Sequence, residues 1–283
     1  MLTSNGYVLD ESPRRLGRLE PVPDDQRDDR AALWQRLRRD GYLFLPKALD
    51  PHDVRAFRRH YFATLAGTGL IARGSNPMHG RSGGDEIDVA ELRRLLFGQV
   101  VPGHEYAQFC TQPALRHWFG WLYGGVPFLH RRKIIRHGRP GAAGIGTATQ
   151  AHYDLVYIRE GTDRLLSAWI PLGDCPIERG GLVYLEGSHQ RVRREEQEGM
   201  LKRPAASITA DLPALADRHN SRWLAADYAA GDVVVHSPYI AHASLDNKDP
   251  EGIIRLSTDI RYQRADEPID WRWQNDWHDA DGL

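Results

Sequence analysis

The chain has 283 residues, 41% of them hydrophobic, and its 37 basic and 38 acidic side chains leave a formal net charge of −1. That length suffices for a sizeable core in one domain or at most two. The near-neutral charge argues against nucleic acid or an anionic membrane as partner, because phosphate binding usually requires a basic excess. The sequence has only two cysteines, and it shows neither a leader-like N-terminus nor an apolar run of membrane-spanning length. These features predict a reduced, cytoplasmic protein.

The first part of the chain predicts two helices around one short strand. Residues 1–28 are polar and contain several prolines, which predicts a loose N-terminal arm. Apolar residues at helical spacing then predict a helix that ends at Gly41. A buried strand is expected at residues 42–46, followed by a second helix with Asp50 as its N-cap.

A loop rich in Gly, Ser and Asn is predicted at residues 72–88. Loops of this length in compact domains cover a binding site or are simply mobile, and the sequence leaves both open. Residues 89–123 predict helical pieces that are interrupted near Pro102 and Pro113.

Beyond Gly124 the segments become short, β-branched and punctuated by Gly and Pro. Many short strands predict a mainly β fold, a double-sheet barrel or jelly roll, with a core at about 125–265. Residues 190–218 interrupt it as a charged, partly helical insertion, and we expect one domain over 1–283. The predicted strands cover residues 132–136, 155–158, 165–170, 181–185, 231–236 and 254–262.

The chemistry of the chain centres on His152 and Asp154. A strand places residues i and i+2 on one face, so this imidazole and carboxylate can grip one ion together. Such a triplet is expected about once by chance in a chain of this composition, so it needs a third ligand.

Two histidines are candidates for that third ligand, His236 and His242. His236 ends an apolar run and is expected to be a core residue, so we choose His242. Two histidines and one carboxylate with open positions form the facial triad of non-haem Fe(II) oxygenases, and zinc is the chemical rival.

Thirteen residues after His242, Arg255 and Ser257 share one face of a predicted strand. A guanidinium beside a hydroxyl suits a carboxylate ligand, and a structural ion pair is the alternative.

Together these segments resemble the phytanoyl-CoA dioxygenase (PhyH) family of Fe(II)/2-oxoglutarate-dependent oxygenases. The order matches over roughly residues 40–265: GYLFLPKALDP, His-x-Asp, WIPL-x-D, E-x-GGL-x-YLEGSH, GDVVVHSPYIAHAS and Arg-x-Ser. The resemblance implies a cupin-like double-stranded β-helix with helices packed on one sheet.

The resemblance also implies the roles of the site residues. His152, Asp154 and His242 would bind Fe(II), and Arg255 would hold the distal carboxylate of 2-oxoglutarate. Further positions that the resemblance or a strand position places near the cosubstrate are Ser257, Ser244, Trp169 and Lys133.

The implied reaction uses O2 and 2-oxoglutarate to oxidise a C–H bond of a small molecule, with release of succinate and CO2. Hydroxylation of a secondary metabolite is the expected outcome. Asp154 argues against halogenation, since related halogenases have a small residue there. Desaturation, epimerisation or ring formation would use the same ligands. The alternative is a non-catalytic or zinc-binding jelly-roll module.

Two further features leave the substrate open. The basic cluster formed by Arg131, Arg132, Lys133, Arg136 and Arg139 suits an anionic substrate, a CoA group or a solvated strand edge. The C-terminal tryptophans either cap the active-site mouth, close the fold or form a subunit contact. These are Trp271, Trp273 and Trp277. We expect a monomer or homodimer.

Overall fold

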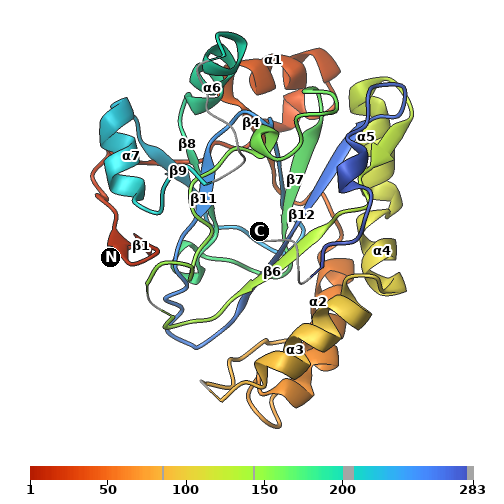
Figure 1. Ribbon diagram of the computed structural model, residues 1–283, viewed down its shortest axis with the longest axis vertical. Helices are drawn as coiled ribbons and strands as arrows, with labels where there is room; N and C mark the ends of the chain where they lie inside the picture. Colours follow the sequence, from red (N-terminus) through yellow and green to blue (C-terminus); the bar gives the residue numbers. More distant parts are fainter. Residues whose placement is uncertain (85, 143, 200–206, 279–283) are drawn as a thin grey trace.

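Two facing β-sheets form the centre of the computed structural model, which describes residues 1–84, 86–142, 144–199 and 207–278 (Figure 1). The larger sheet has the order β4-β10-β7-β12-β5, with β6 also paired to β12, and the smaller has the order β11-β8-β9-β3. This sheet-rich structure with flanking helices confirms the predicted fold class. The strands are β1 (Thr3–Ser4), β2 (Tyr7–Val8), β3 (Leu16–Arg18), β4 (Tyr42–Leu45), β5 (Pro127–Leu129), β6 (Ile134–Gly138), β7 (Leu166–Pro171), β8 (Leu182–Leu185), β9 (Trp223–Ala225), β10 (Val233–His236), β11 (His242–Ser244) and β12 (Arg255–Arg264).

Helices cover the outer face of each sheet. Residues of the first five helices join the outward side chains of the larger sheet in one apolar cluster, as expected for N-terminal helices packed on one sheet. Helix α7 packs in a second cluster against the outer face of the smaller sheet, on the opposite side of the molecule in Figure 1. In the described part of the chain, no helix combines the length and apolar character needed to cross a membrane. The helices are α1 (Arg30–Asp40), α2 (Pro51–Leu65), α3 (Val89–Leu95), α4 (His104–Cys110), α5 (Pro113–Tyr123), α6 (Ser188–Gln197) and α7 (Leu212–His219).

Strand β12 shows how one sequence serves both sides of the larger sheet. Successive side chains of a strand point to opposite faces. Four apolar or hydroxyl residues of β12 therefore contact the helices, while four polar residues face the smaller sheet. The second set is Arg255, Ser257, Asp259 and Arg261. This polar row inside the sandwich marks the functional interior.

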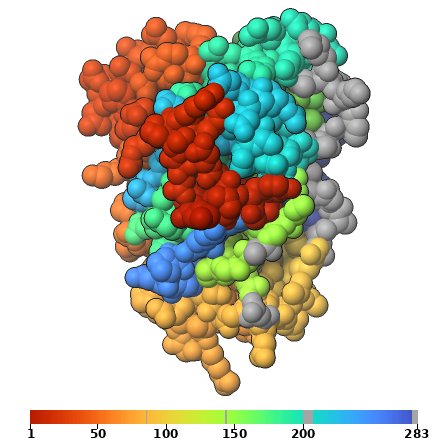
Figure 2. Space-filling view, turned by 90° about the vertical axis from the view of Figure 1, so that its left-hand side faces the viewer, coloured from red at the N-terminus to blue at the C-terminus, as the bar shows by residue number. Residues whose placement is uncertain are grey.

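The N-terminal segment is not the loose arm that its composition predicted. Strand β3 pairs in parallel with β9, which extends the smaller sheet. Thr3 Oγ1 donates to the Asp246 carboxylate at 2.7 Å, and the backbone N–H of Asn5 donates to the same group at 2.9 Å. Figure 2 shows the segment, in red, spread over the surface. Distant partners such as Asp246 order a polar segment that local sequence patterns describe as loop.

The predicted strand at 155–158 is also wrong. Residues Asp154–Val156 form a 3-10 turn, in which the Tyr157 N–H bonds to the Asp154 carbonyl at 3.0 Å. A short apolar run fits a buried strand or a buried turn equally well. The predicted insertion at 190–218 covers most of α6 and of α7, and its residues 200–206 lie outside the described part of the chain.

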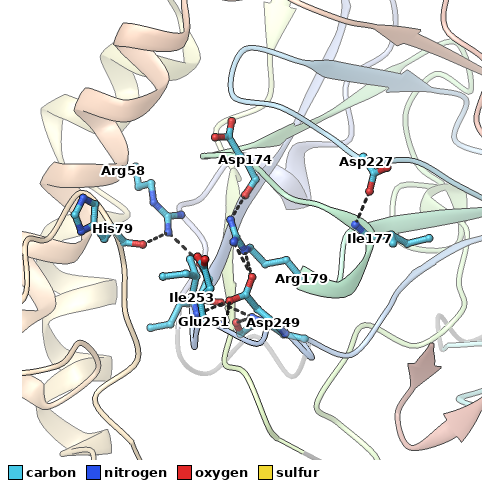
Figure 3. Close-up of polar contacts among 12 residues, drawn as sticks. Arg58, His79, Asp174, Ile177, Arg179, Asp227, Asp249, Glu251 and Ile253 are labelled. Carbon is cyan, nitrogen blue, oxygen red and sulfur yellow. Dashed lines mark hydrogen bonds and ion pairs between the residues drawn. The ribbon is translucent and has the colours of Figure 1, made fainter. Parts of the chain in front are cut away.

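Within the predicted loop at 72–88, Met78 and His79 are attached to the sandwich by Arg58 of α2, and Figure 3 shows Arg58 beside His79. The Arg58 guanidinium donates to the carbonyls of Met78, His79, Leu172 and Ile254 at 2.9–3.1 Å. Leu172 and Ile254 flank the Pro171 end of β7 and the Arg255 end of β12. The loop therefore packs at the ends of these strands that lie away from their Asp154 contacts.

Candidate metal centre

His152, Asp154 and His242 converge between the two sheets. One nitrogen or oxygen atom from each lies within 4.8 Å of the others. The backbone fixes this arrangement, because His152 and His242 form an antiparallel bridge with N–H to carbonyl distances of 3.0 and 2.9 Å. Directly opposed residues of an antiparallel pair present their side chains on the same face. The chain segment before Asp154 thus acts as a further strand beside β11.

Both imidazoles have a defined tautomer. The Nδ1 atom of His152 lies 2.9 Å from the Gln150 carbonyl, and that of His242 lies 3.0 Å from the Ile240 carbonyl. A carbonyl oxygen only accepts, so each Nδ1 carries the proton and donates it. Each Nε2 then keeps a lone pair, which is the state that a metal ion requires.

The Asp154 carboxylate is held by three neighbours. The Arg261 guanidinium donates to Oδ1 at 2.9 Å, and the Ser167 hydroxyl donates to Oδ2. The Nε2 atom of His236 lies 3.4 Å from Oδ2. Asp154 is 1% exposed, so these contacts replace water around the charge and orient the carboxylate.

The electrostatics keep the three side chains ready to bind a cation. Burial alone would raise the pKa of Asp154, but Arg261 and the nearby histidines hold it well below its ordinary value. Burial lowers the pKa of His152 and, more strongly, that of His242. At neutral pH the carboxylate is therefore charged and both imidazoles are neutral.

His236 lies behind Asp154, as expected for a core histidine. It is fully buried, and the Tyr184 hydroxyl lies 3.1 Å from its Nδ1 atom. Its backbone pairs with Ser167 on β7, so His236 and Ser167 support Asp154 from neighbouring strands. The choice of His242 over His236 agrees with this geometry.

Arg255 and Ser257 lie on the same inner face of β12. The guanidinium donates to Ser257 Oγ at 2.7 Å, and Arg255 is 5% exposed. Gly138 of β6 lies opposite, and a Cβ atom there would be 3.1 Å from an Arg255 nitrogen. A side chain at position 138 would therefore displace the Arg255 guanidinium slightly. The pair has no carboxylate partner among the residues that the structure describes.

Two other predicted residues also line the interior. Ser244 faces inward beside His242, and its hydroxyl accepts the Thr149 N–H at 2.7 Å. Trp169 lies opposite Asp259 of β12, and its ring packs against Tyr228 with centroids 4.7 Å apart. Ser244 and Trp169 thus lie on the inner faces of the two sheets.

Lys133 does not belong to this interior, which corrects the prediction. Its ammonium lies 5.5 Å from the centre of the Tyr106 ring in α4, on the helix-covered side of the sheet. Alternation along β6 instead places Arg136, opposite Ser257, on the inner face. The prediction missed Arg136 as an interior residue because the start and phase of this short strand were uncertain within the basic cluster.

The C-terminal tryptophans differ in their environment. Trp271 is 71% exposed. Trp273 is buried, with its ring 5.4 Å from the guanidinium carbon of Arg261, and Trp277 lies 5.7 Å from that of Arg136. Trp273 and Trp277 therefore cover two interior arginines, whereas Trp271 faces solvent.

Comparison with known proteins agrees with this arrangement. A family model described as phytanoyl-CoA dioxygenase (PhyH) matches residues 37–252. The 1-deoxypentalenic acid 11-beta-hydroxylases of Streptomyces exfoliatus and Streptomyces arenae are 28% and 26% identical, and each match covers 84% of this chain and 82% of the relative.

Solved structures share the fold. The non-heme alpha ketoglutarate dependent carbocyclase SnoK from nogalamycin biosynthesis matches with a TM-score of 0.55 and 23% identity over 89% of each chain. EctD from S. alaskensis matches with a TM-score of 0.56 and 16% identity, covering 98% of this chain and 92% of EctD. At these identities the likeness concerns the fold.

Proposed function

This chain belongs to the phytanoyl-CoA dioxygenase family, and we propose that it is an Fe(II)/2-oxoglutarate-dependent dioxygenase that hydroxylates a small molecule. The observation that carries the proposal is the convergence of His152, Asp154 and His242 within 4.8 Å. Two neutral imidazoles and one carboxylate suit Fe(II) with positions left open for other ligands.

Each residue has a defined task in this proposal. His152, Asp154 and His242 would hold Fe(II), with their orientation fixed by the Gln150 and Ile240 carbonyls. Bound Fe(II) would supply O2 activation coupled to conversion of 2-oxoglutarate to succinate and CO2. The protein would bind the reactants and exclude competing reactions.

Arg255 would bind the distal carboxylate of 2-oxoglutarate. Its guanidinium is buried beside the Ser257 hydroxyl, and charge-assisted hydrogen bonds to a carboxylate are strong in such a site. A zinc site that binds no 2-oxoglutarate does not require the carboxylate-binding pair of Arg255 and Ser257, which disfavours the zinc-binding jelly-roll alternative. Ser244 and Trp169 would line the same interior between the sheets.

The substrate is proposed to be a secondary metabolite. The support is the similarity to two Streptomyces enzymes that are named as hydroxylases of 1-deoxypentalenic acid. The retained carboxylate Asp154 is consistent with hydroxylation as the outcome.

The test measures succinate formed by purified full-length protein under anaerobic loading with Fe(II), followed by 2-oxoglutarate and air. We expect succinate only when iron and 2-oxoglutarate are both present. His152→Ala should abolish it, whereas His117→Ala, at an exposed position of α5, should not. Tight zinc binding with no 2-oxoglutarate turnover by the iron-loaded protein would refute the proposal.

A further inference from the structure

The side chains of the basic cluster at residues 131–139 do not all face the same way. Arg131 is exposed and pairs with Asp276 at 2.9 Å. Arg136 is half-buried on β6, directly opposite Ser257, so it faces the interior that also contains Arg255. The cluster is therefore more than a solvated strand edge, because one of its members enters the site.

Arg136 forms no hydrogen bond or ion pair with any other residue that the structure describes. Its guanidinium carbon lies 5.7 Å from the centre of the Trp277 ring, which covers it. It lines a cavity of about 210 Å³ together with Arg255, Thr147 and Thr149. A guanidinium has five N–H donors and stays protonated, so at this half-buried position Arg136 keeps donors available for an anionic ligand.

The interior carries an excess of positive charge. Arg136, Arg255 and Arg261 face two carboxyl groups, Asp154 and Asp259. Asp154 is already engaged by Arg261 at 2.9 Å. Burial raises the pKa of Asp259, although Arg261 opposes this, so Asp259 compensates Arg136 less than a normal aspartate would.

The proposed cosubstrate does not remove this excess. The two charges of Fe(II) and the two of 2-oxoglutarate cancel. Arg255 and Ser257 would bind the distal carboxylate of 2-oxoglutarate, and the metal would bind the opposite end of that molecule. Arg136 remains as a guanidinium with no assigned partner.

We propose that Arg136 binds a carboxylate of the substrate, which makes the substrate a small organic acid. This inference rests on the proposed function and extends it. The contact would hold the substrate at one end beside the metal and thereby restrict which C–H bond is presented. Trp277, whose ring centre lies 5.7 Å from the guanidinium carbon, would shield the ion pair from water.

The first measurement separates the substrate from the cosubstrate as the source of that carboxylate. Binding of 2-oxoglutarate to the Ni(II)-loaded full-length protein is measured by calorimetry for wild type, Arg136→Gln and Arg255→Gln. We expect Arg255→Gln to lose at least about tenfold in affinity and Arg136→Gln to stay within about twofold of wild type. An equal loss in both variants would assign Arg136 to 2-oxoglutarate and overturn the inference.

The second measurement uses a matched pair of probes, cyclohexanecarboxylate and cyclohexanecarboxamide, added to the protein loaded with Ni(II) and 2-oxoglutarate. We expect the carboxylate to bind about tenfold more tightly than the amide, as observed by ligand-detected NMR titration. Arg136→Gln should remove this preference, Arg136→Lys should keep part of it, and Arg131→Gln should leave it intact.

Equal affinity of wild type for the acid and the amide would overturn the inference. So would a preference for the acid that survives in Arg136→Gln. Failure of the proposed function has a different signature, since wild type would then not bind 2-oxoglutarate at all when loaded with Ni(II).

Discussion

The Arg261 guanidinium donates a hydrogen bond to the Asp154 carboxylate at 2.9 Å, and the two side chains are 5% and 1% exposed. Arg261 lies six residues after Arg255 on the same face of β12. One strand therefore supplies a guanidinium that orients a candidate metal ligand and another that suits 2-oxoglutarate. This separation along the strand allows the two roles to be tested independently.

Replacing Arg261 by Met should weaken metal binding. The Asp154 carboxylate would lose the donor that orients it and the charge that contributes most to lowering its pKa, and loss of such partners costs roughly 10- to 100-fold in metal affinity. Titration with Co(II), followed by its visible absorption, measures both affinity and ligand geometry.

Two variants make that result specific. Arg261→Lys should recover part of the affinity, and Arg264→Met should bind Co(II) like wild type, because Arg264 is partly exposed and pairs with Asp266. Unchanged Co(II) affinity and spectrum in Arg261→Met would contradict a positioning role for Arg261.

Replacing Gly138 by Ala should weaken 2-oxoglutarate binding and leave the metal site intact. The added methyl group would lie 3.1 Å from an Arg255 nitrogen, so the guanidinium must shift by a few tenths of an ångström. Misaligned charge-assisted hydrogen bonds should cost about 1 kcal/mol, or roughly fivefold in affinity. Calorimetry on the Ni(II)-loaded protein measures this change.

Gly98→Ala provides the control, because a Cβ atom at Gly98 meets open space. It should bind 2-oxoglutarate with wild-type affinity. If Gly138→Ala also binds normally, the position of the Arg255 guanidinium does not determine the affinity.

The sequence predicts the parts of the site that follow from strand alternation and motif order. His152 and Asp154 share a face because the chain is extended up to Tyr153, and Arg255 and Ser257 share a face of β12. The sequence favours His242 as a ligand because His236 ends an apolar run, and the structure places His236 behind Asp154 at 3.4 Å.

Other features required three-dimensional information. Lys133 and Arg136 belong to one basic cluster, and only the register of β6 against β12 shows which of them faces inward. A shift of one residue moves every side chain of a strand to the opposite face of the sheet. The inward-facing residues of a short strand with an uncertain start therefore cannot be identified from its sequence. The role of Asp246 in ordering residues 3–6 depends on a contact across about 240 positions of the chain.

His137 should make the stability of the fold depend on acid pH. Burial lowers its pKa to about 4, and the charge of Arg255 adds to this effect. An unfolded histidine has a pKa near 6.5, so between these values the unfolded chain binds the proton and the fold does not. The contribution of His137 is therefore intact above about pH 6.5 and falls by roughly 3 kcal/mol toward pH 4.

Urea unfolding of wild type and His137→Gln at pH 7 and pH 4.5 measures this contribution. The variant should be less stable at pH 7, because the Tyr61 hydroxyl loses its 2.6 Å partner, but it should lose less stability on acidification. His117→Gln, at an exposed position, should retain the wild-type slope. Parallel slopes for wild type and His137→Gln would exclude His137 as a source of the acid sensitivity.

Replacing Arg58 by Met should release the loop at 72–84 and destabilise the fold. Four carbonyl oxygens would lose a charged donor, including those of Met78 and His79 in the loop. Figure 3 shows the contact with His79. Buried acceptors without donors are expensive, so we expect a loss of about 3–5 kcal/mol in the free energy of unfolding. Hydrogen exchange of the loop and urea unfolding measure the two effects.

Arg55→Met is the control that distinguishes the loss of the Arg58 hydrogen bonds from the loss of a positive charge on α2. Arg55 lies about one turn earlier, is 47% exposed and approaches Asp174 at 3.7 Å, so its loss should change stability by less than about 1 kcal/mol. The Co(II) affinity of folded Arg58→Met should stay at the wild-type value, because the loop packs at the ends of β7 and β12 that lie away from Asp154. Weakened Co(II) binding in Arg58→Met would show instead that the loop supports the metal centre, and unchanged exchange would show that Arg58 does not hold the loop.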